Sequence, residues 1–380
     1  MNSQIMKQKN VFCFQFGGNK HRMDFDLIII GDGLFGKLMA HFAAKNKIKV
    51  CLIGKRNFKK ISSSYRSEAF VQFIGSFNSN YIHESINFYQ NLLQNKLEAF
   101  SVYSYINEKK EEDKNSDQSL FSNHSSLSKI NAGEGYKLDS HDVLRKLNHE
   151  IIKQKLIYIK DFENLTIAES KIENIVTVSI SNKHRLKTKK IIFAIGPWFS
   201  SLFKSFLTKK ITIFELNSKD LYCEPGLHVC PKLDSFVYIN QFKRSLLCVD
   251  IKSYIEAKKI HLDCAKLSAE ENTLAFQLIN KNFNFSNKVF KSIKLKSIGF
   301  DSYNPHYKNF PIDQLISLNK GTNIFSVPPM NGSGFKYAPS LAKKYIFSIL
   351  ENQYANFNTL SKEIWNETEI NPEEGITINI

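Results

Sequence analysis

The sequence lacks long hydrophobic runs and paired cysteines. No stretch approaches the roughly 20 apolar residues that a membrane-spanning helix requires, and the first 22 residues contain no long apolar region of the kind found in signal peptides. The six cysteines are scattered, none forms a C-x-x-C pair, and no histidines have the spacing of metal ligands. We therefore expect a cytoplasmic protein with reduced thiols, no membrane association and no metal site.

Acidic residues are also fewer than basic residues, and the formal net charge is +16. A basic surface attracts nucleic acid. The lysines, however, are spread along the chain together with many Asn, Ile and Phe residues, a composition that an A/T-rich genome would give to any protein. No RNA-recognition motif accompanies the lysines. We favour the compositional explanation, so nucleic acid stays an open but disfavoured partner, and we expect a monomer.

The most informative stretch present runs from Asp26 to Lys55. Leu27 to Ile30 form an apolar run typical of a strand buried in a parallel sheet. A G-x-G-x-x-G pattern follows where the strand must turn into a helix, whose N-terminus favours phosphate. Such glycines permit the turn, let a pyrophosphate approach the backbone and let the helix pack closely on the sheet. The predicted cofactor contacts in this turn are Gly31, Gly33, Leu34, Phe35 and Gly36.

One part of the dinucleotide pattern is missing. The acidic residue that holds a ribose hydroxyl is expected about 20 residues further on, near Gly54, but Gly54-Lys55-Arg56 contains no carboxylate. Lys55 or Arg56 could contact a phosphate instead. The motif alone therefore leaves NADP open as a rival to FAD.

The C-terminal region narrows this choice. Asn323 to Leu350 has the pattern of a short strand, a glycine-bearing turn and a helix, and the turn is Gly332-Ser333-Gly334-Phe335-Lys336. It resembles the C-terminal signature of the D-amino-acid-oxidase-like FAD-dependent oxidoreductase superfamily, most closely the monomeric sarcosine oxidase and N-methyl amino acid oxidase branch. In that branch the G-x-G-F-K turn lies against the flavin ring.

Three other segments extend the resemblance over most of the chain. Lys189 to Phe203 resembles the family's strand ending in A-x-G-x-W, with Ala194, Gly196 and Trp198 in place. Gly135 to Gln154 and Asn304 to Asp313 resemble a helix-entering segment and the loop before the last strand. Gly196 and Trp198 are therefore further candidate cofactor contacts.

The resemblance implies an α/β protein: a Rossmann-like FAD-binding domain with an interleaved α+β substrate domain built on an antiparallel sheet. The length of 380 residues suits such an architecture. We place a disordered leader at 1–23, the FAD-binding domain at 24–80, 135–205 and 295–352, the substrate domain at 81–134 and 206–294, and a C-terminal extension at 353–380.

The resemblance also implies a chemistry, the oxidation of an amine beside a carboxylate to an imine by hydride transfer to FAD. Lys336 matches the family lysine that meets the substrate carboxylate. Arg66 is a second candidate because arginine suits bidentate carboxylate binding, and Tyr303 is a candidate wall of the substrate pocket. Ser63 and Ser64 are candidate contacts for the FAD phosphates.

Two departures from the branch modify this expectation. The branch attaches flavin to a cysteine at a position that falls near Gly299 here, so we predict non-covalent FAD. The branch also places an oxygen-activating lysine at a position near Leu247, where Lys243 and Lys252 are out of register. The electron acceptor is therefore O2 or another acceptor.

The sequence favours an FAD-dependent amine or amino acid oxidase or dehydrogenase with a small-molecule amine substrate. Three alternatives stay open. One is an FAD-dependent oxidase of a tRNA wobble-uridine aminomethyl group, which the basic charge supports. A second is an amine desaturase of specialised metabolism. The third is a non-catalytic flavin- or NADP-binding protein.

Overall fold

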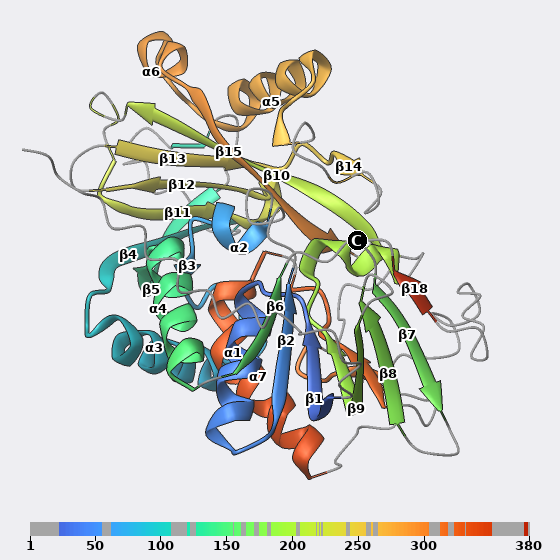
Figure 1. Ribbon diagram of the computed structural model, residues 1–380. Coiled ribbons are helices and arrows are strands. Elements are labelled where there is room, and N and C mark those ends of the chain that lie inside the picture. The colour runs from blue at the N-terminus through green and yellow to red at the C-terminus, as the bar shows by residue number, and fades with distance from the viewer. Residues whose placement is uncertain are drawn as a thin grey trace, which may run out of the picture.

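Figure 1 shows a computed structural model of the chain. The described residues are 23–54, 62–107, 120–121, 127–154, 156–160, 165–170, 175–180, 184–202, 206–217, 219, 221, 223–240, 244–255, 260, 265–303, 312–317, 323–330, 332–351 and 376–378. Lys55 and Arg56 lie outside them, as does nearly all of the predicted leader. The first strand begins at Met23, four residues before the predicted apolar run and on the last residue of the predicted leader.

One of two nine-stranded sheets is built around parallel strands. Its parallel strands, in spatial order, are β6 (Ile157–Lys160), β2 (Val50–Gly54), β1 (Met23–Ile30), β9 (His184–Phe193) and β17 (Ile324–Ser326). Antiparallel strands extend it through β8 (Ile175–Ile180), β7 (Leu165–Ser170) and β18 (Ile376–Ile378), while β16 (Ile316–Ser317) pairs with β17.

Both faces of β1 are buried, which explains its unbroken apolar run. Leu27 and Ile29 belong to one hydrophobic cluster, and Ile28 and Ile30 to another on the opposite face, because successive strand residues point to opposite sides. In Figure 1 the helices gather on the first of these faces. They are α1 (Leu34–Lys45), α3 (Ser79–Leu93), α4 (Ser140–Lys153) and α7 (Gly334–Leu350).

The other sheet lies above the carboxyl ends of β1 and β2 in Figure 1. Its order is β14 (Tyr254–Ile255), β10 (Leu207–Asn217), β13 (Arg244–Val249), β12 (Ser235–Ile239), β11 (Gly226–Cys230), β4 (Glu98–Asn107), β5 (Leu127–Lys137) and β3 (Phe70–Val71), with β15 (Lys294–Tyr303) also paired to β10. Among the strand pairs of this sheet that the described residues form, only β11–β4 is parallel. The helices α5 (Ala269–Asn282) and α6 (Asn287–Lys291) cover its outer face (Figure 1).

This arrangement confirms the predicted fold class: an α/β protein with a Rossmann-like sheet and a second, largely antiparallel sheet. Two short helical segments, α2 (Ser63–Arg66) and η2 (Gly196–Ser201), contact β15. A third, η3 (Pro231–Leu233), joins β11 to β12. None of the helices in the described ranges is long and apolar enough to span a membrane.

Candidate flavin and substrate site

A cavity of about 560 Å³ lies between the two sheets. The residues at the carboxyl ends of β1, β2 and β9 line one side of it, and Ile213, Phe236 and Cys248 of the antiparallel sheet line another. Open α/β sheets bind their ligands beyond the carboxyl ends of parallel strands. The cavity is therefore the natural candidate for a cofactor site.

The three glycines of the first motif have different roles. Gly31 has φ +111°, and a Cβ there would lie 2.3 Å from the Ala194 carbonyl oxygen; a Cβ on Gly36 would lie 1.7 Å from the Gly31 carbonyl oxygen. A Cβ on Gly33 would meet only the Ser64 hydroxyl, at 3.2 Å. Gly31 and Gly36 thus allow strand, turn and helix to pack, whereas Gly33 keeps space open at the cavity wall.

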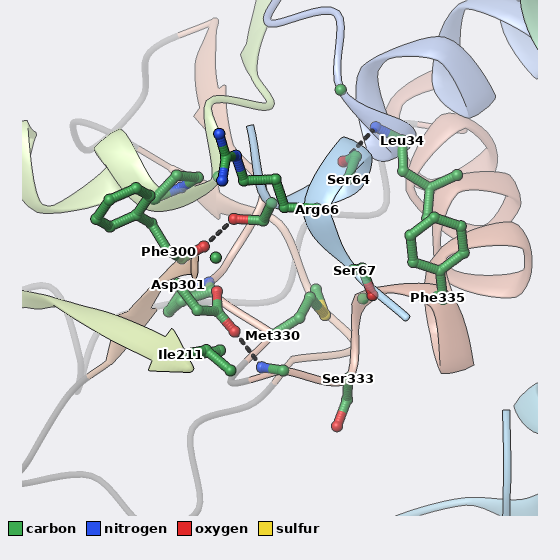
Figure 2. A pocket seen from close by; sticks show the side chains of 18 of the residues that line it. Leu34, Ser64, Arg66, Ser67, Ile211, Phe300, Asp301, Met330, Ser333 and Phe335 are labelled. Carbon is green, nitrogen blue, oxygen red and sulfur yellow. Dashed lines mark hydrogen bonds between the residues drawn. The ribbon is translucent and has the colours of Figure 1, made fainter. Parts of the chain in front are cut away.

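The N-terminus of α1 can receive a phosphate. Gly33 is its N-cap and supplies no capping side chain, and no acidic residue lies in the first turn. The Leu34 N–H donates to the Ser64 hydroxyl at 3.0 Å (Figure 2). Because a helix N-terminus carries partial positive charge, this cradle fits the pyrophosphate of a dinucleotide, with Gly33, Leu34, Phe35 and Ser64 at the cavity.

The second glycine motif also lines the cavity and is tied to β15. The Gly332 N–H donates to the Asp301 carboxylate (Figure 2), and Gly332 has φ +80°, which favours glycine. The Ser302 hydroxyl donates to the Gly196 carbonyl at 3.1 Å. The predicted contacts Gly332, Ser333, Gly334 and Phe335 all line the cavity.

Asp301 is an acidic residue at the cavity that the sequence analysis missed. Burial raises the pKa of its carboxyl to about 6, against the opposing effect of N–H donation from Gly332 and Ser302 and of the charge on Lys209. The signal was present in the sequence as one carboxylate inside the otherwise uncharged strand segment Ser297–Tyr303. Lys209 lies directly opposite Asp301 on β10 and pairs with Asp250 at 2.6 Å.

Lys336 lies in the first turn of α7, lines the cavity and is only 5% exposed. Its ammonium donates to the Ile74 carbonyl at 2.7 Å and lies 5.4 Å from the Tyr337 ring centroid. Within the described residues it has no carboxylate partner. Burial lowers its pKa to about 8. This is a buried cation suited to an incoming anion.

The remaining predicted residues divide into three groups. Arg66, Gly196 and Trp198 line the cavity, and Figure 2 shows Arg66 extending from α2 on the side where Phe300 lies. Ser63 also lines it, but its hydroxyl donates to the Phe300 carbonyl and so anchors α2 to β15. Gly36 packs behind the turn, outside the lining.

Tyr303 is not placed in the cavity wall. Its ring stacks on Tyr254, with ring centroids 6.2 Å apart, and the Lys209 ammonium lies 5.6 Å from its centroid. Leu247, the position predicted for the oxygen-activating lysine, belongs to the cluster under α5. Its neighbour Cys248 lines the cavity instead, because neighbouring strand residues face opposite ways.

Comparison with known proteins identifies the fold. No protein-family model matches the chain, and no curated protein matches it at a significant level. Among solved structures it is similar to NikD, an unusual amino acid oxidase essential for nikkomycin biosynthesis, with a TM-score of 0.65 and 10% identity over 88% of this chain and 95% of NikD.

Two further structures have different activities. L-proline dehydrogenase from P. horikoshii matches with a TM-score of 0.64 and 12% identity over 88% of this chain and 96% of that one. L-α-glycerophosphate oxidase from Mycoplasma pneumoniae, solved with FAD bound, matches with a TM-score of 0.61 and 12% identity over 86% and 95%. The chain therefore shares the overall fold of these three structures.

The glycine geometry predicts opposite outcomes for two substitutions. Gly33→Val should leave the protein folded, because Gly33 has ordinary extended dihedrals, yet it should abolish FAD binding by filling pyrophosphate space. Gly36→Ala should destabilise the fold by about 3 kcal/mol or more, since its methyl group overlaps a backbone carbonyl. Thermal unfolding and FAD titration of both variants test this; stoichiometric FAD in folded Gly33→Val would contradict it.

The pKa of Asp301 predicts a pH effect on stability. A carboxyl whose pKa is raised to about 6 in the folded state stabilises the fold while protonated, and this contribution is lost as pH rises from about 4 to about 6. Asp301→Asn keeps an acceptor for the Gly332 N–H. Over this pH range its free energy of unfolding should rise by up to about 3 kcal/mol relative to that of wild type. Urea unfolding at several pH values measures the difference.

The matched control is Asp142→Asn, which removes an exposed ion pair with Arg145 on α4 and should have little effect. Parallel stability profiles for wild type and Asp301→Asn would show that the Asp301 carboxyl is not protonated in the folded protein.

Proposed function

We propose that the protein is an FAD-dependent oxidoreductase that oxidises the C–N bond of a small amine or amino acid bearing a carboxylate. FAD would supply the redox chemistry by accepting a hydride equivalent, leaving an imine as product. O2 or another acceptor would then reoxidise the cofactor, non-covalently bound. Oxidases and a dehydrogenase share this fold, so the fold does not choose the acceptor.

The observation that carries the proposal is the burial of Lys336 beside the second glycine turn. A cation removed from water is costly unless an anion or hydrogen bonds compensate for it. Within the described part of the chain, Lys336 donates to one carbonyl, that of Ile74. A substrate carboxylate would complete its coordination and favour its charged form. The ammonium would then hold the carboxylate end of the substrate at the cavity wall, with the amine end pointing into the cavity.

The antiparallel sheet contributes both apolar and charged residues to the lining. Ile213, Leu227 and Phe236 are apolar, whereas Lys209 pairs with Asp250 at 2.6 Å. The apolar part would exclude water from the reacting carbon and favour a neutral amine over an ammonium ion, as hydride loss requires. Arg66 is a second cation at the cavity and is proposed as an additional carboxylate contact.

The first experiment is the visible spectrum of the purified protein, followed by acid precipitation. Flavin bands with FAD released into the supernatant would support the proposal. A yellow pellet would mean that the flavin is covalently attached. A colourless protein that FAD cannot reconstitute would overturn the flavoenzyme assignment.

Substrate is then tested by anaerobic bleaching of the flavin with primary, N-methylated and cyclic amino acids and with the matching amines that lack a carboxylate. Faster bleaching by the carboxylate-bearing member of each pair is expected. Absence of bleaching by every compound would favour a non-catalytic flavin-binding protein.

Lys336→Met should lower kcat/KM for a carboxylate-bearing substrate by about 100-fold, the value of one hydrogen bond to a charged group. FAD affinity and activity towards the matching amine should be retained. Lys344→Met, on the same helix but paired with Asp313 at 2.8 Å, is the matched control. Equal losses for acid and amine substrates would remove Lys336 from the carboxylate site.

Wild-type affinity for a short aliphatic carboxylate should fall above about pH 8, because the pKa of Lys336 is lowered to about 8 by burial and the neutral amine no longer attracts the anion. Perturbation of the flavin spectrum measures this affinity. An affinity that stays constant to pH 10 would contradict the assignment.

A further inference from the structure

The end of β2 lacks an acidic side chain that dinucleotide-binding sheets usually carry there, and the neighbouring turn carries one instead. In dinucleotide-binding sheets an acidic residue there accepts a hydrogen bond from the 2′-hydroxyl of the adenosine ribose. The last residue of β2 is Gly54, which has no side chain. The turn after β1 carries Asp32 between the first two glycines of its motif.

The pairing of β1 and β2 brings these two positions together. The strands are parallel, with Ile30 beside Ile53, and the Gly31 N–H donates to the Ile53 carbonyl at 2.8 Å. A Cβ built on Gly54 would lie 2.4 Å from Asp32 Cγ and 2.8 Å from Asp32 Oδ1. The Asp32 carboxylate therefore occupies the space into which a side chain from the end of β2 would project.

A buried lysine holds this carboxylate in place. Lys37, in the first turns of α1, is fully buried, and its ammonium lies 3.6 Å from Asp32 Oδ2. The Asp32 side chain is 13% exposed, and both Asp32 and Gly54 line the cavity. A carboxylate offers about four acceptor sites, so pairing with Lys37 is compatible with accepting a hydrogen bond from a ribose hydroxyl.

We infer that Asp32 binds the 2′-hydroxyl of the adenosine ribose of FAD, replacing the acid that is absent from β2. This inference rests on the proposed function, which makes FAD the cofactor. It also bears on the choice between nucleotides. A carboxylate at this point accepts a hydrogen bond from a hydroxyl but repels a 2′-phosphate, so the same geometry disfavours NADP.

The test uses the full-length protein freed of bound flavin and measures FAD affinity by titration. Asp32→Ala should weaken FAD binding by about 10- to 100-fold, as expected for a hydrogen bond to a charged acceptor. ADP and 2′-deoxy-ADP are then compared as competitors of FAD. Wild type should bind ADP about tenfold or more tightly than 2′-deoxy-ADP, and Asp32→Ala should bind them equally.

A reciprocal substitution separates ribose binding from a purely structural role. Gly54→Glu alone should lose FAD affinity, because its Cβ overlaps the Asp32 carboxyl. The double variant Asp32→Gly/Gly54→Glu also removes the Cβ of residue 32, which would lie 2.5 Å from a Cβ at residue 54. It returns a carboxylate from the end of β2 and should recover both FAD affinity and preference for ADP. Asp26→Ala, which removes an acid paired with Lys189 near the other end of β1, is the control and should bind FAD normally.

The outcomes distinguish the inference from the proposed function. Wild-type protein that binds NADP but cannot be reconstituted with FAD would defeat both. Wild-type protein that binds FAD, while Asp32→Ala shows unchanged affinity or an unchanged preference for ADP over 2′-deoxy-ADP, would overturn the inference alone. Failure of the double variant to regain any affinity lost in Asp32→Ala would likewise count against it.

Discussion

The structure depends on a close backbone approach between β1, the turn after it and α1. The Gly31 and Gly36 positions leave no room for a Cβ, because carbonyl oxygens of Ala194 and Gly31 occupy that space. This contact sets the angle at which α1 leaves the sheet and brings its N-terminus to the cavity. It also places β9 so that Ala194 and Gly196 reach the same edge. Packing therefore accounts for Gly31 and Gly36, whereas Gly33 leaves open the space that the proposed cofactor would use.

A second set of contacts joins the two sheets around the cavity. Polar side chains in α2 and β15 bond to backbone groups of other segments: Ser63 to Phe300, Ser302 to Gly196 and Asp301 to Gly332. Each bond uses a main-chain group that would otherwise lose its hydration when the sheets pack together. The cavity is thus bounded by residues that β15 positions, although β15 itself belongs to the antiparallel sheet.

Much of the fold was predictable because its signals are local. The apolar run of β1, the glycine turn and the helix after it are contiguous, and so are β17, the second turn and α7. The face of a strand on which each side chain lies was harder to predict from the sequence. Leu247 and Cys248 differ by one position, yet they lie on opposite faces of β13, and a one-residue error in register reverses a strand's faces.

Asp32 illustrates a different limit. Asp32 is visible within the glycine motif, but the ribose-binding acid is expected about 20 residues after that motif, near residue 54. Only the pairing of β1 with β2 shows that the two positions share one space. Asp301 was likewise detectable as an acid in an apolar strand, whereas its bond to Gly332 spans 31 residues of sequence and depends on the packing of α7.

The substrate is the part of the function least determined by these constraints. The parallel sheet, both glycine turns and α7 build the side of the cavity that we propose holds the cofactor. An amino acid oxidase and a glycerophosphate oxidase share this fold. The opposite side comes from β10 to β13, where the residues facing the cavity alternate with residues packed under α5 and α6. Substitutions on the cavity face can change the shape of the site without disturbing that second core. Under the proposed function, substrate choice would therefore be separable from cofactor binding, and the charge of Lys336 would be the feature of the cofactor side that most restricts the substrate.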